Sequence, residues 1–194
     1  MLVYGANTRS RKMSNAYLPR HAIEKKAQDV RQATGFTSIP VDPARLATAL
    51  GIEIKYERLS QDVSGALMRK GEKAVIAVNS EHSANRRTFT LAHEIGHFFL
   101  HQDDPVFLDK VVMHRNAVSS RGDDIKEIQA NQFAASLLMP RDVLESAYEK
   151  LLETTNVRHE IVERLARQFS VSKHAMELRL VNLALIAVDD DGDE

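Results

Sequence analysis

The sequence predicts an α+β fold in which a small antiparallel sheet packs against one long helix. Two observations support this prediction. Segments with apolar residues at helical spacing lie before and after a short region in which apolar and polar residues alternate. In addition, helices and strands do not alternate along the chain, as they would in a parallel sheet with crossover helices. The expected order is therefore helices, strands and then helices again.

The first half of the chain supplies two helices and three strands. A helical pattern over residues 14–34 ends at Gly35, and Asp42 is placed to cap a second, short helix that begins at Pro43. Strand character follows at residues 52–56, 63–68 and 74–78. We expect these three segments to form a small and largely antiparallel sheet.

The second half of the chain is helical. Its longest pattern covers residues 83–101 without a proline, and a loop with Asp103 and Pro105 ends it. Further helices are expected at residues 124–138, at 141–152 and, in two pieces separated by a break at 170–172, at 159–187.

Composition excludes several classes of protein. The chain has 194 residues and a formal net charge of -1, so no overall charge attracts it to nucleic acid or to a membrane surface. No apolar run approaches the roughly 18 residues of a membrane span, and the polar start has no signal-peptide pattern. The absence of cysteine excludes disulfides, thiolate metal sites and cysteine nucleophiles. We therefore expect a cytoplasmic protein without membrane contact, in which a metal site would use imidazole and carboxylate.

The strongest motif in the chain is HEIGH at residues 93–97. On a helix, His93 and His97 lie one turn apart on the same face, so both imidazoles can reach one zinc ion. Glu94 lies about 100° further round the helix, where its carboxylate can act as general base on the water that the metal activates. Two ordinary histidines on a salt-bridged helix face are the alternative. The apolar residues on both sides of the motif favour a buried helix and hence the metal site.

A catalytic zinc site needs a third protein ligand. His101 lies two turns from His93 on the same helix, too far to complete a tetrahedron, so we expect a packed or capping histidine. Glu127 on the next helix is better placed, and Asn131, one turn later, can hydrogen-bond an imidazole. Asp123 and Asp124 compete with Glu127, but they fall near the expected start of that helix and are expected to cap it.

Two separate segments, in this order, resemble the ImmA/IrrE family of zinc metallopeptidases. The resemblance covers roughly residues 20–185 and is carried by RTFTLAHEIGH at 87–97, LH at 100–101, EIQANQFAA at 127–135, LLMP at 137–140 and IPVD at 39–42. It implies a gluzincin-like fold in which His93, His97 and Glu127 hold Zn²⁺ and Glu94 is the general base. Many members carry a second acid where this chain has Gln129, which leaves Glu127 without a competitor there.

The resemblance also implies a function and a division into domains. Family members cleave or otherwise inactivate a helix-turn-helix repressor, typically encoded beside them, in DNA-damage, mobile-element or phage-defence responses. The expected division is a disordered tail at 1–14, a metallopeptidase domain at 15–155, a helix-turn-helix-like region at 156–187 and an acidic tail at 188–194. A non-proteolytic zinc protein that sequesters the repressor is the alternative function.

The helix-turn-helix-like region allows a third reading, namely contact with DNA. Lys173, His174 and Arg179 could touch phosphate, whereas Glu177 opposes it. We expect these helices to serve packing or partner docking instead. The sequence also allows a nucleic-acid activator of the peptidase, but no residue indicates where it would bind.

The donor that stabilises the oxyanion during peptide hydrolysis has no motif of its own. His114, Tyr148 and Arg115 are the candidates, and no spacing argument favours one of them.

Overall fold

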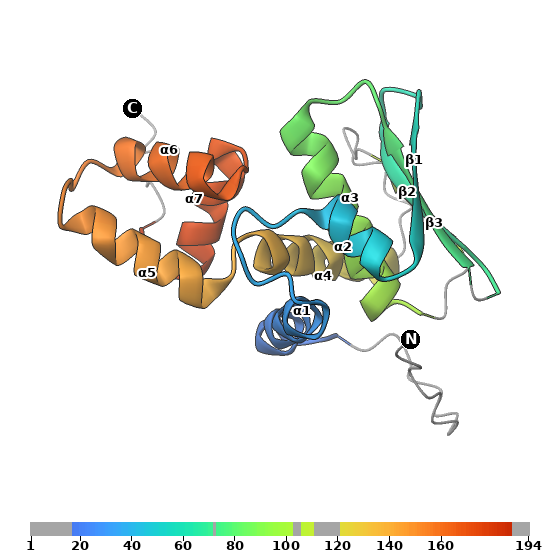
Figure 1. Cartoon of the computed structure of the whole chain (residues 1–194), viewed down its shortest axis with the longest axis horizontal. Helices are drawn as coiled ribbons and strands as arrows, with labels where there is room; N and C mark the ends of the chain where they lie inside the picture. Colours follow the sequence, from blue (N-terminus) through green and yellow to red (C-terminus); the bar gives the residue numbers. More distant parts are fainter. Residues whose placement is uncertain (1–16, 72, 103–105, 111–120, 188–194) are drawn as a thin grey trace.

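The computed structural model describes residues 17–71, 73–102, 106–110 and 121–187. In this part of the chain a four-stranded sheet lies on one side of the molecule, a group of three helices lies on the other, and α3 and α4 lie between them (Figure 1). The elements are α1 (Arg20–Thr34), α2 (Pro43–Ala49), β1 (Ile52–Glu57), β2 (Val63–Lys70), β3 (Lys73–Asn79), α3 (Ala84–Leu100), β4 (Val106–Lys110), α4 (Arg121–Leu138), α5 (Arg141–Leu152), α6 (Arg158–Phe169) and α7 (Lys173–Asn182). The predicted α+β class is confirmed.

The sheet is mixed and not antiparallel throughout. Its strand order is β1-β3-β2-β4; β2 runs antiparallel to both of its neighbours, but β1 pairs in parallel with β3, with Ile52 opposite Ala74. The prediction of an antiparallel sheet is therefore wrong for β1. The reason lies in β3, whose continuous apolar run over residues 74–78 requires an interior position with neighbours on both sides. β3 therefore inserts between β1 and β2, which follow each other along the chain.

The strand β4 forms the second edge of the sheet, where the sequence predicted only a loop. It pairs with β2, with Phe107 opposite Leu67. Five residues are too few for a periodic signal, so only the free edge of β2 selects this segment as a strand.

Local capping explains where several helices begin and end. The Asp42 carboxylate accepts hydrogen bonds from the backbone N–H groups of Ala44 and Arg45, and Pro43 occupies the first position of α2, as predicted. Gly35 ends α1 with φ = 75°, a left-handed conformation that glycine adopts without strain. Ser83 caps α3 through its hydroxyl, which accepts from the N–H of Arg86.

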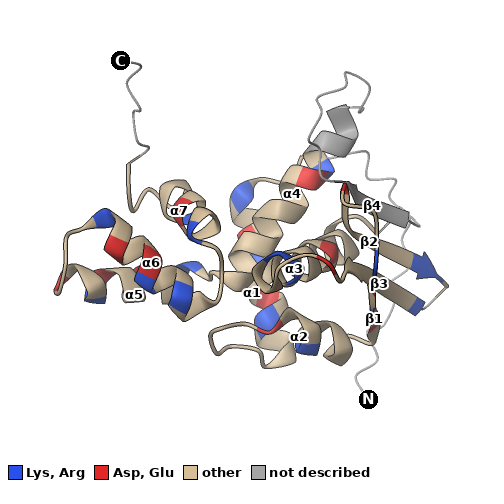
Figure 2. Cartoon of the chain, turned by 90° about the horizontal axis from the view of Figure 1, so that it is seen from above, with Lys and Arg blue, Asp and Glu red and all other residues tan. Residues whose placement is uncertain are grey.

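The helices α5, α6 and α7 lie together, with charged residues of both signs intermixed on their surfaces (Figures 1 and 2). α5 packs on α6, and α6 on α7. The Arg179 guanidinium of α7 donates to the carbonyl of Met139 and forms an ion pair with Glu24 of α1, which ties this group of helices to the rest of the chain. The division at residue 155 stays a prediction; α5, which precedes it, packs on the helices that follow it.

One continuous apolar core extends from the sheet through α3 and α4 to α7. It includes Ile76 of β3, Ile95 of α3, Phe133 of α4 and Leu180 of α7. Among the described residues, no helix has the length and apolarity needed to cross a bilayer.

Candidate metal centre

His93, His97 and Glu127 converge on one point between α3 and α4. The two imidazole Nε2 atoms are 2.9 Å apart, and the Glu127 carboxylate oxygens lie 3.0 Å from Nε2 of His93 and 3.2 Å from Nε2 of His97. Both histidines are buried, whereas the Glu127 side chain is 38% exposed. These three residues form a group that could hold a metal ion.

Close packing of α3 on α4 brings the three side chains together. A Cβ atom on Gly96 would lie 3.1 Å from the carbonyl oxygen of Ala130 and 3.2 Å from its Cα. Contacts this short with backbone atoms mean that a Cβ atom at this position would push the two helices apart by a few tenths of an ångström. The glycine on α3 and the alanine on α4 therefore set the helix separation that lets Glu127 reach the two histidines.

Hydrogen bonds on the far side of each ring fix the imidazole tautomers. The Asn131 side-chain oxygen lies 2.9 Å from Nδ1 of His93 and, having no hydrogen, accepts from it. The Nε2 atom of neutral His93 then carries a lone pair that points at His97 and Glu127.

The second ring is fixed through an intermediate histidine. The Gln129 side-chain oxygen lies 2.9 Å from Nε2 of His101, so this nitrogen is the donor and Nδ1 of His101 is the acceptor. Nδ1 of His97, at 2.9 Å, donates to that acceptor. Nε2 of His97 therefore also presents a lone pair to the shared point.

The donor set fits a transition-metal ion. Zinc ligands lie about 2.0–2.1 Å from the metal, so the ligand atoms of a tetrahedral site are separated by roughly 3.3 Å. The observed separations of 2.9, 3.0 and 3.2 Å are close to this value. Two lone pairs and a carboxylate that face one another at such distances would repel without a cation between them.

The protonation states of His97 and Glu127 at neutral pH also favour metal binding. Burial is the main cause that lowers the pKa of His97 to about 4, so this ring is neutral. Burial alone would raise the pKa of Glu127, but the hydrogen bonds and charge interactions that protonated His93 and His97 would offer this carboxylate outweigh that effect and bring its pKa to about 2. Neutral imidazoles and an ionised carboxylate are the forms that bind metals.

Glu94 is fully buried on the side of α3 that faces β2. A Cβ atom on Gly65 of β2 would lie 3.1 Å from Oε1 of Glu94 and 2.5 Å from Cγ2 of Thr90. The missing side chain at Gly65 therefore makes the space that the Glu94 carboxylate occupies, a role that the sequence pattern does not reveal.

Other candidates from the sequence fall elsewhere. The Tyr148 hydroxyl donates to the carbonyl of Leu185, in the group of C-terminal helices. His114 and Arg115 lie outside the described residues, as do the side chains of Asp123 and Asp124, which belong to the first turn of α4.

His101 is a buried histidine at the C-cap of α3, which confirms the prediction of a packed or capping residue. Sequence reasoning missed Arg69 of β2, whose guanidinium donates to the carbonyls of His97, Phe98 and His101 at the end of this helix. A lone arginine on a strand gives no signal of such a contact.

The suggestion that Arg179 contacts phosphate is wrong. This side chain is buried and pairs with Glu24, because α7 turns it toward α1 and away from solvent. Lys173 pairs with Glu163, and Glu177 with Arg158, on the surface of the same helices.

Sequence comparisons agree with this geometry. A peptidase family model described as the IrrE N-terminal-like domain matches residues 47–181. The radiation response metalloprotease IrrE of Deinococcus radiodurans is 33% identical over 131 residues, which cover 68% of this chain and 38% of that protein. The protein of the same name from Deinococcus deserti is 30% identical over 117 residues, covering 60% and 41%. The match thus spans about two fifths of these longer relatives.

A structure comparison finds a transcriptional regulator of Mycobacterium tuberculosis, with a TM-score of 0.60 and 20% identity. The match covers 86% of this chain and 48% of that chain, and it shows a shared fold. Because the family model covers most of the chain and includes the HEIGH helix, α4 and nearly all of α7, the chain belongs to the IrrE N-terminal-like family of metallopeptidases.

Proposed function

We propose that this protein is a zinc-dependent endopeptidase in which His93, His97 and Glu127 hold the metal. The observation that supports this most directly is the convergence of two imidazole lone pairs and a carboxylate within 3.2 Å of one another. When bound, zinc supplies Lewis-acid chemistry, which polarises a carbonyl group and lowers the pKa of water.

The residues of the chain carry the proton transfers. Glu94 acts as general base: its carboxylate accepts a proton from the water that attacks the peptide carbonyl carbon, and passes it to the nitrogen of the leaving amine as the C–N bond breaks. Asn131 and His101 orient the imidazoles through their Nδ1 hydrogen bonds. The burial of Glu94 keeps bulk water away from the carboxylate.

As substrate we propose a helix-turn-helix repressor, encoded beside this protein and inactivated in a stress, DNA-damage, mobile-element or defence response. The family resemblance supports this proposal, and the Deinococcus relatives are described as radiation response metalloproteases.

The test begins with elemental analysis of gently purified protein, for which we expect one zinc per chain. The protein is then incubated with the neighbouring repressor, with and without a chelator, and the products are analysed by mass spectrometry. Wild type should give defined fragments, and chelator should abolish them. The Glu94→Gln variant should retain the zinc and lose about 10²–10⁴-fold in kcat, the usual contribution of general acid–base catalysis.

Two results would contradict the proposal. Glu94→Gln that relieves repression fully in cells would favour the non-proteolytic alternative, a zinc protein that sequesters the repressor. Absence of stoichiometric metal in wild type would remove the basis of the hydrolytic mechanism.

A further inference from the structure

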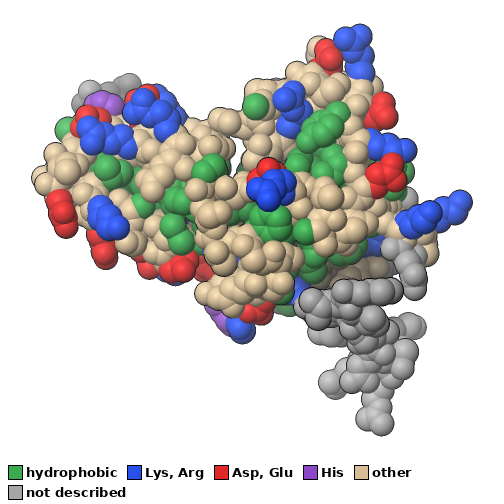
Figure 3. All heavy atoms as spheres, viewed as in Figure 1, with side chains coloured by type: hydrophobic (Ala, Val, Ile, Leu, Met, Phe, Trp, Pro, Cys, Tyr) green, Lys and Arg blue, Asp and Glu red, His purple; other side chains and the backbone are tan. Residues whose placement is uncertain are grey.

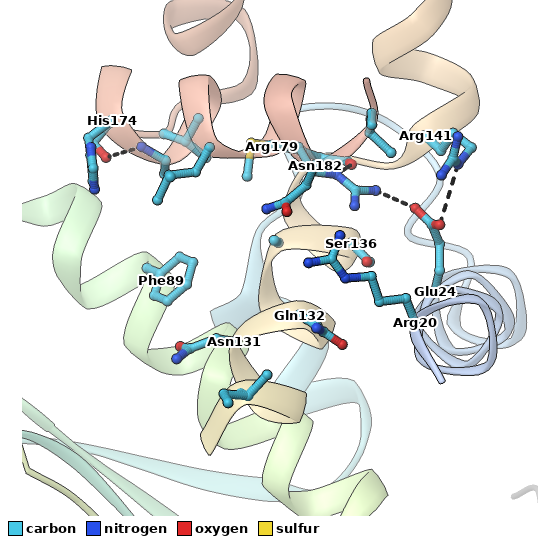
Figure 4. A pocket seen from close by; sticks show the side chains of 18 of the residues that line it. Arg20, Glu24, Phe89, Asn131, Gln132, Ser136, Arg141, His174, Arg179 and Asn182 are labelled. Atoms are coloured by element: carbon cyan, nitrogen blue, oxygen red, sulfur yellow. Dashed lines mark hydrogen bonds and ion pairs between the residues drawn. The ribbon is translucent and has the colours of Figure 1, made fainter. Parts of the chain in front are cut away.

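A groove of about 960 Å³ lies between α7 on one side and α1, α3 and α4 on the other. The molecular outline is indented between the group of C-terminal helices and the rest of the chain (Figure 3). Figure 4 shows its walls: His174, Arg179 and Asn182 come from α7, Phe89 from α3, Asn131 and Gln132 from α4, and Arg20 from α1. The volume is at the upper end of the roughly 300–1,000 Å³ found for ligand sites.

The groove presents apolar side chains to solvent. Ile128 of α4 and Leu178 of α7 are 51% and 50% exposed, and both line the groove. Phe89, which is half-buried, adds further apolar lining. Large apolar side chains gathered in one concave place are typical of a binding surface.

The same groove carries an excess of positive charge. Its lining includes four arginines, Arg20, Arg86, Arg141 and Arg179, against one acid, Glu24. Glu24 already pairs with Arg141 and Arg179, which leaves two arginines for an occupant. Among the described residues neither Arg20 nor Arg86 forms an ion pair; Arg86 donates one hydrogen bond to the neutral Ser64 hydroxyl, and Arg20 lines the groove together with Ser136 (Figure 4).

The groove reaches the edge of the metal centre at Asn131. Asn131 lines it, and the same side chain accepts the hydrogen bond from Nδ1 of His93. Phe89, also in the lining, lies on α3 one turn before His93. A chain that occupies the groove is therefore separated from His93 by the Asn131 side chain alone.

We propose that this groove binds the part of the substrate polypeptide on one side of the cleaved bond, and that it selects a segment with apolar side chains and at least one Asp or Glu. This inference rests on the proposed peptidase function. In this view the helix-turn-helix-like region is one wall of the substrate site. Arg20 and Arg86 pair with the substrate carboxylates, and Ile128 and Leu178 contact its apolar side chains.

The experiment uses the zinc-loaded full chain and a peptide library prepared from a bacterial proteome. Cleavage sites are identified by mass spectrometry, and kcat and KM are then measured on one acidic peptide from the selected set. We expect Asp and Glu to be enriched on one side of the cleavage site. The Arg20→Glu, Arg86→Glu double variant should lose this enrichment and raise KM about tenfold or more, with kcat nearly unchanged.

Two controls separate local effects from folding. Arg167→Glu reverses an exposed charge on α6 outside the groove and should leave the profile unchanged. The neutral variant Arg20→Gln, Arg86→Gln should give a smaller rise in KM and serves if the charge-reversed variant does not fold. Thermal melting checks each variant.

The outcomes distinguish this inference from the function on which it rests. Cleavage by wild type without acidic preference, or with a preference that the double variant retains, overturns the role of the groove and leaves the peptidase intact. A groove that serves a small-molecule effector or a second copy of the chain would give this same unchanged profile. A zinc-loaded wild type that cleaves no peptide overturns the proposed function, and the inference with it.

Discussion

The α3–α4 pair and the α6–α7 pair use their polar side chains in opposite ways. In α3–α4, side chains from both helices point at one shared position, where His93, His97 and Glu127 meet. In α6–α7, the charged side chains form separate contacts: Lys173 pairs with Glu163 on the surface, and Arg179 turns inward to Glu24. The first arrangement brings several potential metal ligands to one point, whereas the second holds two parts of the chain together.

The difference is whether local helix geometry or a tertiary contact determines the direction of each side chain. One turn of helix brings His93 and His97 to the same face whatever the rest of the fold does. The direction of Arg179, in contrast, depends on Glu24, a partner 155 positions away in the sequence. The helix-turn-helix-like sequence pattern therefore predicts the helix α7, but it does not predict which face of α7 is exposed to solvent.

The largest effect on stability is expected at α7. Arg179→Met should lower the free energy of unfolding by about 3 kcal/mol, because it removes a buried guanidinium that pairs with the partly exposed Glu24 and donates to the Met139 carbonyl. Lys173→Met, which removes an exposed pair, should change it by less than about 1 kcal/mol. Urea denaturation measures both. Equal effects would mean that α7 does not tie its neighbours together.

Acid should weaken the α3–α4 pair. The pKa of His97 is about 4 in the folded chain against 6.5 for the free side chain, so the unfolded state binds more protons between these values. The stability of the metal-free chain should therefore fall as pH decreases from 6.5 to 4, by at most about 3 kcal/mol. Glu127, with a pKa of about 2, stays ionised over this range.

Denaturation of the metal-free chain at several pH values tests this expectation, and His97→Gln should flatten the dependence. A wild-type stability that is constant between pH 4 and 6.5 would contradict the neutral, buried state of His97.

The next largest effect is expected when a methyl group is added between α3 and α4. Gly96→Ala should cost about 1–3 kcal/mol, because its Cβ meets backbone atoms of Ala130 that cannot rotate away. Zinc affinity should fall as well, since Glu127 is displaced from the two histidines. Chelator competition measures the affinity. Wild-type affinity in this variant would show that helix separation does not set the site.

The smallest effect is expected at Gln129, which is two hydrogen bonds away from His97, a proposed metal ligand. Gln129→Leu removes the acceptor for His101 and should weaken zinc binding about 10–100-fold. Gln129→Glu keeps an acceptor and should bind nearly as wild type.

Nitrogen chemical shifts of His97 provide a readout that a packing defect would not move. In wild type they should report hydrogen on Nδ1, and in Gln129→Leu a mixture of tautomers. A uniform Nδ1–H tautomer in Gln129→Leu would show that Gln129 does not direct the ring.

Local patterns were enough to predict most of the helices. Asp42 before Pro43, and Gly35 after a helical pattern, give boundaries that depend only on neighbouring residues. The metal group was predicted for the same reason: its two histidines share a helix, and Glu127 follows on the next predicted helix with small residues around it.

The features that the sequence did not predict depend on contacts between residues far apart in the chain. The parallel pairing of β1 follows from the interior position of β3, and β4 exists because β2 offers it an edge. Gly65 beside Glu94 and Arg69 at the end of α3 act across the boundary between sheet and helix. None of these contacts produces a periodic pattern in the sequence from which it could be predicted.

Arg69 has a consequence for how the molecule comes apart. Its guanidinium holds three carbonyl oxygens at the C-terminal end of the helix that carries both histidines of the candidate metal centre, and its backbone belongs to a central strand of the sheet. Withdrawing that strand would uncap the last turn of the helix, and fraying that turn would free His97 to rotate. If the proposed zinc is bound, its loss and melting of the sheet are expected to be one cooperative event, so a calorimetric scan of zinc-loaded protein should show a single transition at higher temperature than that of the metal-free chain.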